Sequence, residues 1–254
     1  DEADVIAAAG LCREYGAPIT SRGAATSIAG QCCNVAVILD FSKYMNRVLD
    51  LDPRRKLARV QPGTVCDTLR DAAEEHQLTF GPDPATHAWC TIGGMIGNNS
   101  CGVHSQMAGR TSDNVEALEV LTYRGERLCA GRTNARDLEA LIRAGGAKAD
   151  IYRRLDELRN RYGDLVRRRF PRIPRRLSGY NLDALLPEEN FQVARSLVGS
   201  EGTCVLMLEA VVNLVPSPQH RSLLVIGFDD IYEAADEIPE VVEEEPIGLE
   251  GVDK

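Results

Sequence analysis

Two stretches of small and polar residues could do chemistry through their backbone. Residues 21–30 read SRGAATSIAG and residues 91–102 read TIGGMIGNNSCG, with few bulky side chains in either. Short side chains let several backbone N–H groups converge on one point, which is how a protein can cradle phosphate oxygens. The chain contains no G-x-x-x-x-G-K-[ST] and no G-x-G-x-x-G between a strand and a helix, so the two standard phosphate-binding motifs are excluded.

Two further turns have the same character. Residues 81–86 (GPDPAT) form a rigid turn, and residues 199–203 (GSEGT) run into an expected strand. Thr26 and Ser27 could add hydroxyl donors and Arg22 a positive charge, although a surface ion pair is an equally ordinary role for this arginine. Taken alone, each turn also fits a structural role, with polar side chains capping it. Their recurrence favours a large polar ligand that lies against main chain.

The elements that must position these turns alternate irregularly. Helical patterns cover residues 4–15, 64–76, 134–144, 150–170, 188–198 and 231–242. Strand patterns cover residues 17–20, 36–40, 47–52, 56–61, 115–123, 126–131, 204–214 and 221–228, with hairpins at 47–61 and 115–131. A doubly wound parallel sheet would require strict alternation, so the sequence predicts an α+β fold. The pattern restarts beyond Pro218, which predicts one domain over residues 1–216 and the truncated start of a second over residues 217–254.

Bulk composition excludes several classes of function. The chain has 254 residues, 44% of them hydrophobic, and a formal net charge of -9. An acidic net charge argues against a general nucleic-acid binder, because phosphate neutralisation needs a basic face, so we expect no nucleic-acid partner. No apolar run is long enough to span a bilayer. The arginine-rich residues 153–176 indicate a solvated helix face followed by a Pro-punctuated loop, with an anion or RNA site as the alternative.

The cysteines are scattered, without a C-x-x-C spacing. They are Cys12, Cys32, Cys33, Cys66, Cys90, Cys101, Cys129 and Cys204. This pattern disfavours zinc and iron–sulfur sites and favours reduced, mostly buried thiols in a cytoplasmic protein. The opening residues DEADVIAAAGLCREYG have neither an initiator methionine nor a signal-peptide layout, so we expect an excised fragment.

Together these motifs resemble a known family, the flavoproteins with a PCMH-type FAD domain of the vanillyl-alcohol-oxidase superfamily. Within it they are most similar to the branch of D-lactate, glycolate and D-2-hydroxyglutarate dehydrogenases. The matching segments, in the family's order, are SRGAATSIAG, VLDLD through ARVQPG, GPDPATHAWCTIGGMIGNNSCG, TSDNVEALEVLTYRGERL, and GSEGT before VNLVP. The resemblance implies a two-subdomain α+β FAD-binding fold followed by the start of an α+β substrate domain. GYNLDALLPE and IGLEGVD look similar to a subgroup with a downstream iron–sulfur domain, so a cluster is implied only beyond Lys254.

By this resemblance, cofactor-binding roles fall on 22 residues. Those implied to wrap the FAD pyrophosphate are Ser21, Arg22, Gly23, Ala24, Ala25, Thr26 and Ser27, with Gly30 at the end of that stretch. Those implied to line the flavin and the diphosphate are Pro82, Asp83, Pro84, Ala85, Thr86, Thr91, Gly93, Gly94, Gly97, Asn98, Asn99 and Ser100, and Glu201 and Gly202 approach from the other side.

Two positions depart from the family's usual pattern. Ala25 stands where the family usually has glycine, and a positive φ at an alanine would cost on the order of 1 kcal/mol. Thr26 stands where some members carry a histidine joined covalently to the flavin. Because threonine cannot form that bond, FAD is expected to be non-covalent.

The activity that the resemblance implies is the oxidation of a small D-2-hydroxy acid by hydride transfer to flavin N5, with electrons leaving to a separate acceptor. A base must take the hydroxyl proton. His76 and His220 are expected to be solvated, whereas His87 and His104 could face the flavin. Catalytic base and metal or carboxylate ligands are expected in the later substrate domain, so no metal site is expected here. Candidates that could reach the substrate pocket are Arg175, Arg176 and Tyr180.

Two alternatives stay open from the sequence. The same scaffold could act on another donor, such as a sugar lactone, an alcohol or a cell-wall precursor. It could also be a non-catalytic nucleotide-binding module, in which residues 21–27 hold a phosphate ligand and nothing reacts. The expected location is cytoplasmic, or peripheral to the inner membrane in a full-length protein.

Overall fold

The fold is organised around a five-stranded antiparallel sheet. The computed structural model describes residues 1–252. The sheet has the strand order β3-β4-β8-β6-β7, and every neighbouring pair is antiparallel. Its strands are β3 (Val48–Asp52), β4 (Leu57–Val60), β6 (Val115–Thr122), β7 (Arg127–Ala130) and β8 (Val205–Asn213). The predicted hairpins are β3–β4 and β6–β7, with β8 paired between them, and the α+β class is confirmed.

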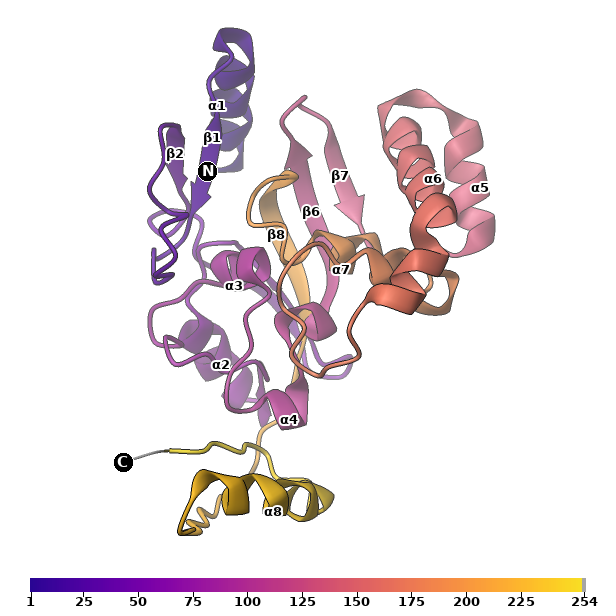
Figure 1. Cartoon of the computed structure of the whole chain (residues 1–254). Helices are drawn as coiled ribbons and strands as arrows, with labels where there is room; N and C mark the ends of the chain where they lie inside the picture. The colour runs from indigo at the N-terminus through magenta and orange to yellow at the C-terminus, as the bar shows by residue number, and fades with distance from the viewer. Residues whose placement is uncertain (253–254) are drawn as a thin grey trace.

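A smaller unit lies beside this sheet. The helix α1 (Glu2–Tyr15) leads to the strands β1 (Ile19–Arg22) and β2 (Val37–Asp40), which pair in parallel. The Asp1 side chain caps the first turn of α1, and Gly16 ends it with φ 66°. The unit is joined to the large sheet by a cluster of buried side chains made of Val5, Ala9, Phe41, Met45, Leu121, Leu206 and Leu208. Figure 1 shows α1, β1 and β2 on one side of the sheet and the helices α5 and α6 on the other.

The remaining elements flank the sheet or connect its strands. The helices are α2 (Cys66–Glu74), α3 (Ile92–Asn98), α4 (Ser105–Ala108), α5 (Ala135–Ala144), α6 (Gly146–Arg169), α7 (Val193–Leu197) and α8 (Ile231–Glu243). The 3-10 turns are η1 (Thr111–Asn114), η2 (Leu182–Leu185) and η3 (Pro187–Glu189), and the strands β5 (Leu78–Thr79) and β9 (Val215–Pro216) form a short antiparallel pair. No helix within residues 1–252 combines the length and the apolar character needed to cross a membrane.

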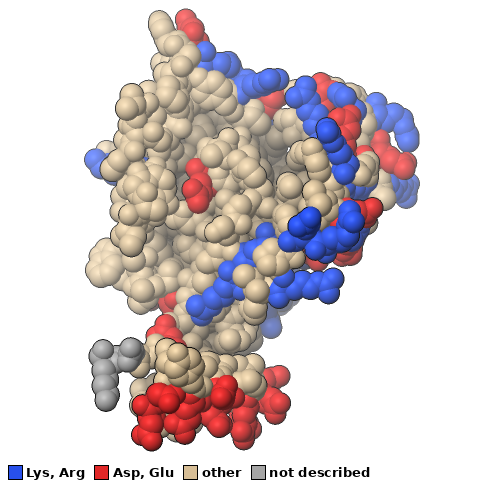
Figure 2. Space-filling model, viewed as in Figure 1, with Lys and Arg blue, Asp and Glu red and all other residues tan. Residues whose placement is uncertain are grey.

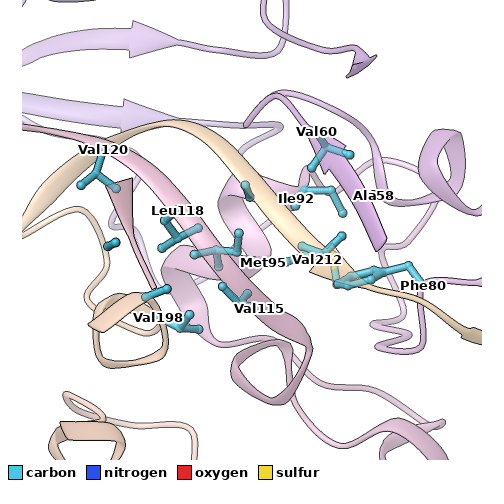
Figure 3. Close-up of a cluster of buried hydrophobic side chains, with 14 of the residues drawn as sticks. Ala58, Val60, Phe80, Ile92, Met95, Val115, Leu118, Val120, Val198 and Val212 are labelled. Carbon is cyan, nitrogen blue, oxygen red and sulfur yellow. The ribbon is translucent and has the colours of Figure 1, made fainter. Parts of the chain in front are cut away.

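The main core lies where α3 packs against the sheet. Ile92 and Met95 of α3 are 0% and 1% exposed, and Figure 3 shows them beside Val60, Val115 and Leu118 of the strands. Burying side chains of this size contributes about 1.5–3 kcal/mol each. This packing places the glycine-rich residues that follow Thr91 at the centre of the molecule.

The arginine-rich segment is a solvated helix face, as expected. Arg153 pairs with Asp150 at 2.5 Å, and Arg167 pairs with Asp164 at 3.1 Å and with Glu188 at 2.7 Å. Figure 2 shows Lys and Arg side chains over α6 and the loop after it, and Asp and Glu side chains over α8.

The helix predicted over residues 188–198 is wrong in its first half. Only α7 (Val193–Leu197) is α-helical there, after the short turn η3. Asn190 and Phe191 have φ values of 57° and 47°, which interrupt a right-handed helix. Gln192 instead forms an isolated antiparallel bridge with Arg132. The amphipathic pattern gave no sign of this break.

The strand predicted over residues 221–228 is also wrong, because the segment has no regular structure. An extended segment needs a paired neighbour to satisfy its backbone, and none of the strands within residues 1–252 takes this role. The helix predicted next is present as α8. None of the described residues after Ser217 is buried, and Figure 1 shows α8 apart from the sheet.

The turn η1, which starts β6, contains a carboxylate whose ionisation stabilises the fold. Backbone N and Nη2 of Arg110 each donate to Asp113 at 2.9 Å. Burial raises the pKa of Asp113, but the hydrogen bonds from Arg110 outweigh it and hold this pKa below its usual range. A depressed folded-state pKa means that the pair stabilises the protein above the unfolded pKa, about 4, and that this contribution is lost as pH falls through the folded pKa.

We therefore predict that Asp113→Asn lowers the free energy of unfolding more at pH 7 than at pH 3, measured by urea denaturation. Asp164→Asn is the control, since the Asp164 side chain is 89% exposed and its ion pair contributes little. Equal losses for Asp113→Asn at both pH values would contradict the prediction.

Candidate functional site

A cavity of about 590 Å³ opens between the small unit, α3 and the large sheet. This volume lies in the range of small-molecule and cofactor pockets. Figure 2 shows mostly uncharged side chains around the hollow on this face. Of the residues predicted to bind a cofactor, those that line the cavity are Ser21, Arg22, Gly23, Ala24, Ala25, Thr26, Ser27, Thr86, Thr91, Gly93, Gly94, Gly97, Asn98, Ser100, Glu201 and Gly202. Three segments far apart in the sequence thus share one cavity.

The first segment presents unpaired backbone donors. The Arg22 carbonyl accepts from Phe41 N at 3.0 Å, which fixes the end of β1, and the chain then turns at Ala25 with φ 55°. Within the described residues, the N–H groups of residues 24–27 donate to no protein acceptor. Buried or half-buried N–H groups usually have a partner. Ala24 and Ala25 are exposed, so water can satisfy their N–H groups, whereas Thr26 and Ser27 are half-buried. The four free donors in the cavity wall are therefore available to an anionic or polar ligand.

The side chains around this loop also include orphaned polar atoms. Nη2 of Arg22 donates to the Asp40 carboxylate at 2.8 Å. Burial opposes ionisation of Asp40, yet hydrogen bonds from Ser42 and Arg22 outweigh it and hold the pKa of Asp40 below its usual range. Arg22 is thus partly neutralised by a protein carboxylate. Buried polar atoms without a partner are Ser21 Oγ, Arg22 Nε and Gln31 Oε1, and all three residues line the cavity.

The second segment is a helix, not the bare loop that its composition suggested. Thr91 is the N-cap of α3, and its side chain accepts from Gly94 N at 3.2 Å. The apolar residues Ile92, Met95 and Ile96 follow helical spacing and are buried, which drives the segment into a helix despite its glycines. The glycine content indicates a loop here, whereas the spacing of the apolar residues indicates a helix, and the structure has the helix.

The glycines of α3 have two different roles. Gly93 N donates to Pro62 O at 2.8 Å, and a Cβ at Gly93 would meet that same oxygen at 2.7 Å, so only glycine allows this contact. A Cβ at Gly97 would meet nothing within 4 Å, although Gly97 lines the cavity. Gly97 therefore leaves cavity space open, whereas Gly93 permits close backbone packing.

The third segment is tied to the end of α3. Gly199 N donates to Ile96 O at 2.8 Å, and Glu201 N donates to Gly97 O at 3.0 Å. These bonds satisfy carbonyls that a helix leaves without an internal partner. Gly202 follows with φ 73° and open space around it. Tyr180 reaches the rim of the cavity indirectly, because its hydroxyl lies 2.9 Å from Thr203 Oγ1 and Thr203 lines the cavity.

Six predicted residues do not line the cavity. They are Gly30, Pro82, Asp83, Pro84, Ala85 and Asn99. Asp83 pairs with Arg70 at 2.6 Å and with His104 at 3.0 Å, so its carboxylate is engaged by neighbouring side chains. Asn99 is 0% exposed and accepts from Ser112 N at 2.9 Å through Oδ1. Its φ of 52° ends α3, a structural role that its position in a polar run did not reveal.

Several residues of the cavity wall were not predicted. Polar ones include Gln31, Cys32 and Asn34, which continue the first segment, and Ser200 and Thr203 in the third. Apolar ones come mainly from the sheet and neighbouring loops: Ile19, Phe41, Pro62, Met95, Ile96, Leu118, Leu197, Val205 and Met207. The remaining ones are Thr20 and Cys90. Small-residue content could not identify the apolar wall, because these side chains look like ordinary core residues in sequence.

The candidate acid–base and substrate residues lie elsewhere. His87 Nδ1 lies 2.8 Å from the Asp67 carboxylate, and neither His87 nor His104 lines the cavity. His76 and His220 are exposed, as expected. Arg175 bonds Ser105 Oγ at 2.8 Å, and Arg176 bonds Asp183 at 2.6 Å. Neither arginine lines the cavity.

Residues 1–252 contain no disulfide and no cluster of metal-ligating side chains. All eight cysteines are free, but only Cys12, Cys66 and Cys90 are buried, so the expectation of mostly buried thiols is wrong. No group of three or more His, Cys, Asp or Glu side chains in this part of the chain is arranged to hold a metal ion.

Comparison with known proteins defines the class of this domain. The family of FAD-binding domains (FAD_binding_4) matches residues 1–131, and the chain belongs to this family. The chain is similar to D-2-hydroxyglutarate dehydrogenase of Pseudomonas putida, with 31% identity over 236 residues, 92% of this chain and 24% of that protein. It is also similar to glycolate oxidase subunit GlcD of Bacillus subtilis, with 29% identity over 91% of this chain and 39% of that subunit. D-lactate dehydrogenase of Anaerostipes hadrus is 24% identical over 93% of this chain and 39% of that enzyme. The chain thus spans about a quarter of the length of the D-2-hydroxyglutarate dehydrogenase that it matches.

The residues of the cavity fit FAD. Free N–H groups of residues 24–27 suit phosphate oxygens, and the side-chain-poor face at Gly94 and Gly97 leaves room for a flat polar group. The unpartnered atoms of Ser21 and Gln31 provide further hydrogen-bonding capacity.

The strained turn at Ala25 gives a prediction about the stability of the fold. Removing the side chain relieves about 1–2 kcal/mol of strain at a positive φ, and the added entropy of the unfolded chain offsets about 0.4–1 kcal/mol of this. Ala25→Gly should therefore raise the free energy of unfolding by up to about 1 kcal/mol. The matched control is Ala24→Gly, at the neighbouring exposed position, where φ is not positive. There glycine only adds entropy to the unfolded chain and should lower stability by about 0.4–1 kcal/mol. Urea denaturation measures both, and equal shifts in the two variants would argue against strain at Ala25.

The open space at Gly97 gives a prediction about FAD binding. Gly97→Leu should weaken FAD binding by about tenfold or more, equivalent to about 1.4 kcal/mol, because the side chain enters the cavity. The fold should be kept, since no protein atom within 4 Å opposes the new Cβ and leucine favours a helix more than glycine does. Flavin fluorescence titration measures the affinity, and thermal unfolding measures stability.

Gly10→Leu in α1 is the matched control, because a Cβ there also meets nothing within 4 Å and Gly10 does not line the cavity. It should leave FAD affinity unchanged. Unaltered FAD affinity in Gly97→Leu would show that the ligand does not use this face of α3.

Proposed function

We propose that this chain is the FAD-binding domain of a flavin-dependent oxidoreductase that oxidises a small D-2-hydroxy acid and passes the electrons to a separate acceptor. The observation that supports it is the single cavity shared by residues 21–27, α3 and residues 199–203. The donor class is supported by the relatives, which are a D-2-hydroxyglutarate dehydrogenase, a glycolate oxidase subunit and a D-lactate dehydrogenase.

In this proposal the chain binds and orients the cofactor by main chain. The N–H groups of residues 24–27 meet the diphosphate, and Gly94 and Gly97 allow close approach of the ligand to α3. FAD, when bound, supplies the two-electron chemistry by accepting a hydride from the donor. Thr26 cannot bond covalently to a flavin, so the cofactor is held non-covalently. The acid–base group lies outside this cavity wall, since His87 and His104 face Asp67 and Asp83 instead.

The proposed domain division is residues 1–216 for the FAD domain and residues 217–254 for the beginning of a substrate domain. Both hydrophobic clusters are built from residues up to Leu214, and none of the described residues beyond Ser217 is buried. The exposed apolar side chains after the boundary include Leu223, Leu224, Val225 and Ile231. Such a segment has the composition of a folded domain without a core of its own. A cytoplasmic location and an iron–sulfur domain beyond Lys254 stay predictions.

A flavin titration tests the cofactor assignment, and donor reduction tests the activity. Titrating the flavin-free chain with FAD should quench flavin fluorescence, and acid precipitation should release all of the flavin. In a protein that carries this domain together with its substrate domain, anaerobic addition of a D-2-hydroxy acid should bleach the flavin absorbance. If a sugar lactone or an alcohol bleaches the flavin and a D-2-hydroxy acid does not, the proposed donor class is wrong. Reduction by dithionite without reoxidation by any acceptor would favour the non-catalytic alternative.

A further inference from the structure

Two buried cysteines lie opposite each other at the cavity wall, and the proposed function does not use them. Val65 and Thr91 form an isolated antiparallel bridge. In antiparallel pairing the next opposed residues are Cys66 and Cys90, and Cys66 N donates to Cys90 O at 2.9 Å. Residues directly opposite in such a pair have Cα atoms about 4.5–5.5 Å apart and side chains on the same face.

This register matches the geometry of a disulfide. Disulfide-bonded cysteines have Cα atoms about 4.4–6.8 Å apart, a range that includes the spacing of directly opposed residues. Both cysteines are free, and they are 0% and 6% exposed. Cys90 is one of the residues that line the cavity, whereas Cys66 does not line it and its Sγ lies 3.9 Å from Pro82 O.

The surroundings distinguish the two sulfurs. The interaction with the Cys66 thiol, helped by a hydrogen bond from Thr86, lowers the pKa of Cys90. The same interaction with Cys90, together with burial, raises the pKa of Cys66. The thiolate is the reactive form, and Cys90 is the cysteine of this pair that lines the cavity, so Cys90 is the expected nucleophile.

We propose that Cys66 and Cys90 are a redox-active dithiol, which a small hydroperoxide oxidises to a disulfide in the wall of the cavity. The Cys90 thiolate attacks one peroxide oxygen, the O–O bond breaks, and a Cys90 sulfenic acid and water form. The Cys66 sulfur then attacks the Cys90 sulfur and displaces a second water, which gives the disulfide. Two thiols lose two electrons and hydrogen peroxide gains them, so the products are one disulfide and two waters.

The disulfide would connect the start of α2 with the residue before the N-cap of α3. Cys66 is the first residue of α2, and Cys90 directly precedes Thr91. The vicinal pair Cys32 and Cys33 offers no comparable geometry, because Cys33 is exposed and adjacent cysteines rarely pair with each other. A disulfide between Cys66 and Cys90 would therefore tie the start of α2 to the start of α3, and α3 lines the cavity.

Peptide mapping after peroxide treatment tests the proposal. The full chain is treated with hydrogen peroxide, free thiols are alkylated under denaturing conditions, and trypsin cuts after Arg59, Arg70 and Arg110. The expected product is residues 60–70 joined to residues 71–110, with fragmentation that places the bond at Cys90 and not at Cys101. Dithiothreitol should return both peptides to their alkylatable form.

Three variants sharpen the result. Cys101→Ser should keep the cross-link, because Cys101 shares the tryptic peptide with Cys90 but not its position opposite Cys66. Cys66→Ser should instead accumulate the sulfenic acid at Cys90, detected with a dimedone probe, and Cys90→Ser should leave Cys66 alkylatable. In the unaltered chain, sulfinic acid at Cys90 beside an alkylatable Cys66 would overturn the proposal. So would two unreacted cysteines after the exposed Cys33 and Cys204 have been oxidised.

Discussion

The cavity depends on the backbone hydrogen bonds at the two ends of α3. At its start Gly93 N donates to Pro62 O, and at its end the carbonyls of Ile96 and Gly97 accept from residues 199 and 201. A helix of seven residues is not stable by itself, because helix nucleation outweighs the few bonds that it gains. Burial of Ile92, Met95 and Ile96 against the sheet supplies the missing stability. The helix in turn holds the loop of residues 199–203 at the cavity, which sequence separation alone would leave far from it.

Unfavourable backbone conformations accumulate around the same helix. Ala25, Asn99 and Glu201 all have positive φ, at values of 55°, 52° and 51°. Each costs on the order of 1 kcal/mol for a residue with a side chain, somewhat less for asparagine. Such conformations persist only where surrounding contacts determine them. Here the contacts are visible: Asn99 is fully buried against Ser112, and the Glu201 backbone completes the end of α3. The strain therefore follows from bringing three chain segments to one place.

The sequence predicted the fold better where one physical signal dominated. The hairpins β3–β4 and β6–β7 follow from alternating apolar residues around short turns, and α1 follows from an amphipathic pattern that ends at Gly16. Where two signals conflicted, the prediction was wrong. Glycines suggested a loop at residues 91–102, yet the buried apolar residues make a helix. At residues 188–198 an amphipathic pattern suggested one helix, but the positive φ at Asn190 and Phe191 depends on tertiary contacts that no local pattern contains.

The sequence indicated those parts of the candidate site that have a distinctive local composition and missed the parts that do not. The small-residue segments reach the cavity because close approach of backbone requires them, so their composition carries the signal. Asp83 and Asn99 do not line the cavity, and composition could not reveal this, because a short polar side chain looks the same whether it binds a ligand or a neighbouring chain segment. Gln31, Asn34 and the apolar wall carry no local signal, since only the three-dimensional arrangement places them at the cavity.

The charges at the cavity explain how an acidic chain can bind an anionic cofactor. Among the described residues that line it, Arg22 is the one basic side chain and Glu201 the one acidic side chain, so formal charges there balance. Arg22 is moreover engaged by Asp40 at 2.8 Å. The net charge of -9 has little effect at the cavity, because physiological salt screens exposed charges that lie more than about 8 Å away. Backbone N–H dipoles act at contact distance and in a less polar environment, where each hydrogen bond is electrostatically stronger than in water. Free donors at residues 24–27 can therefore outweigh the unfavourable global charge, which is why small residues matter more to this site than basic ones.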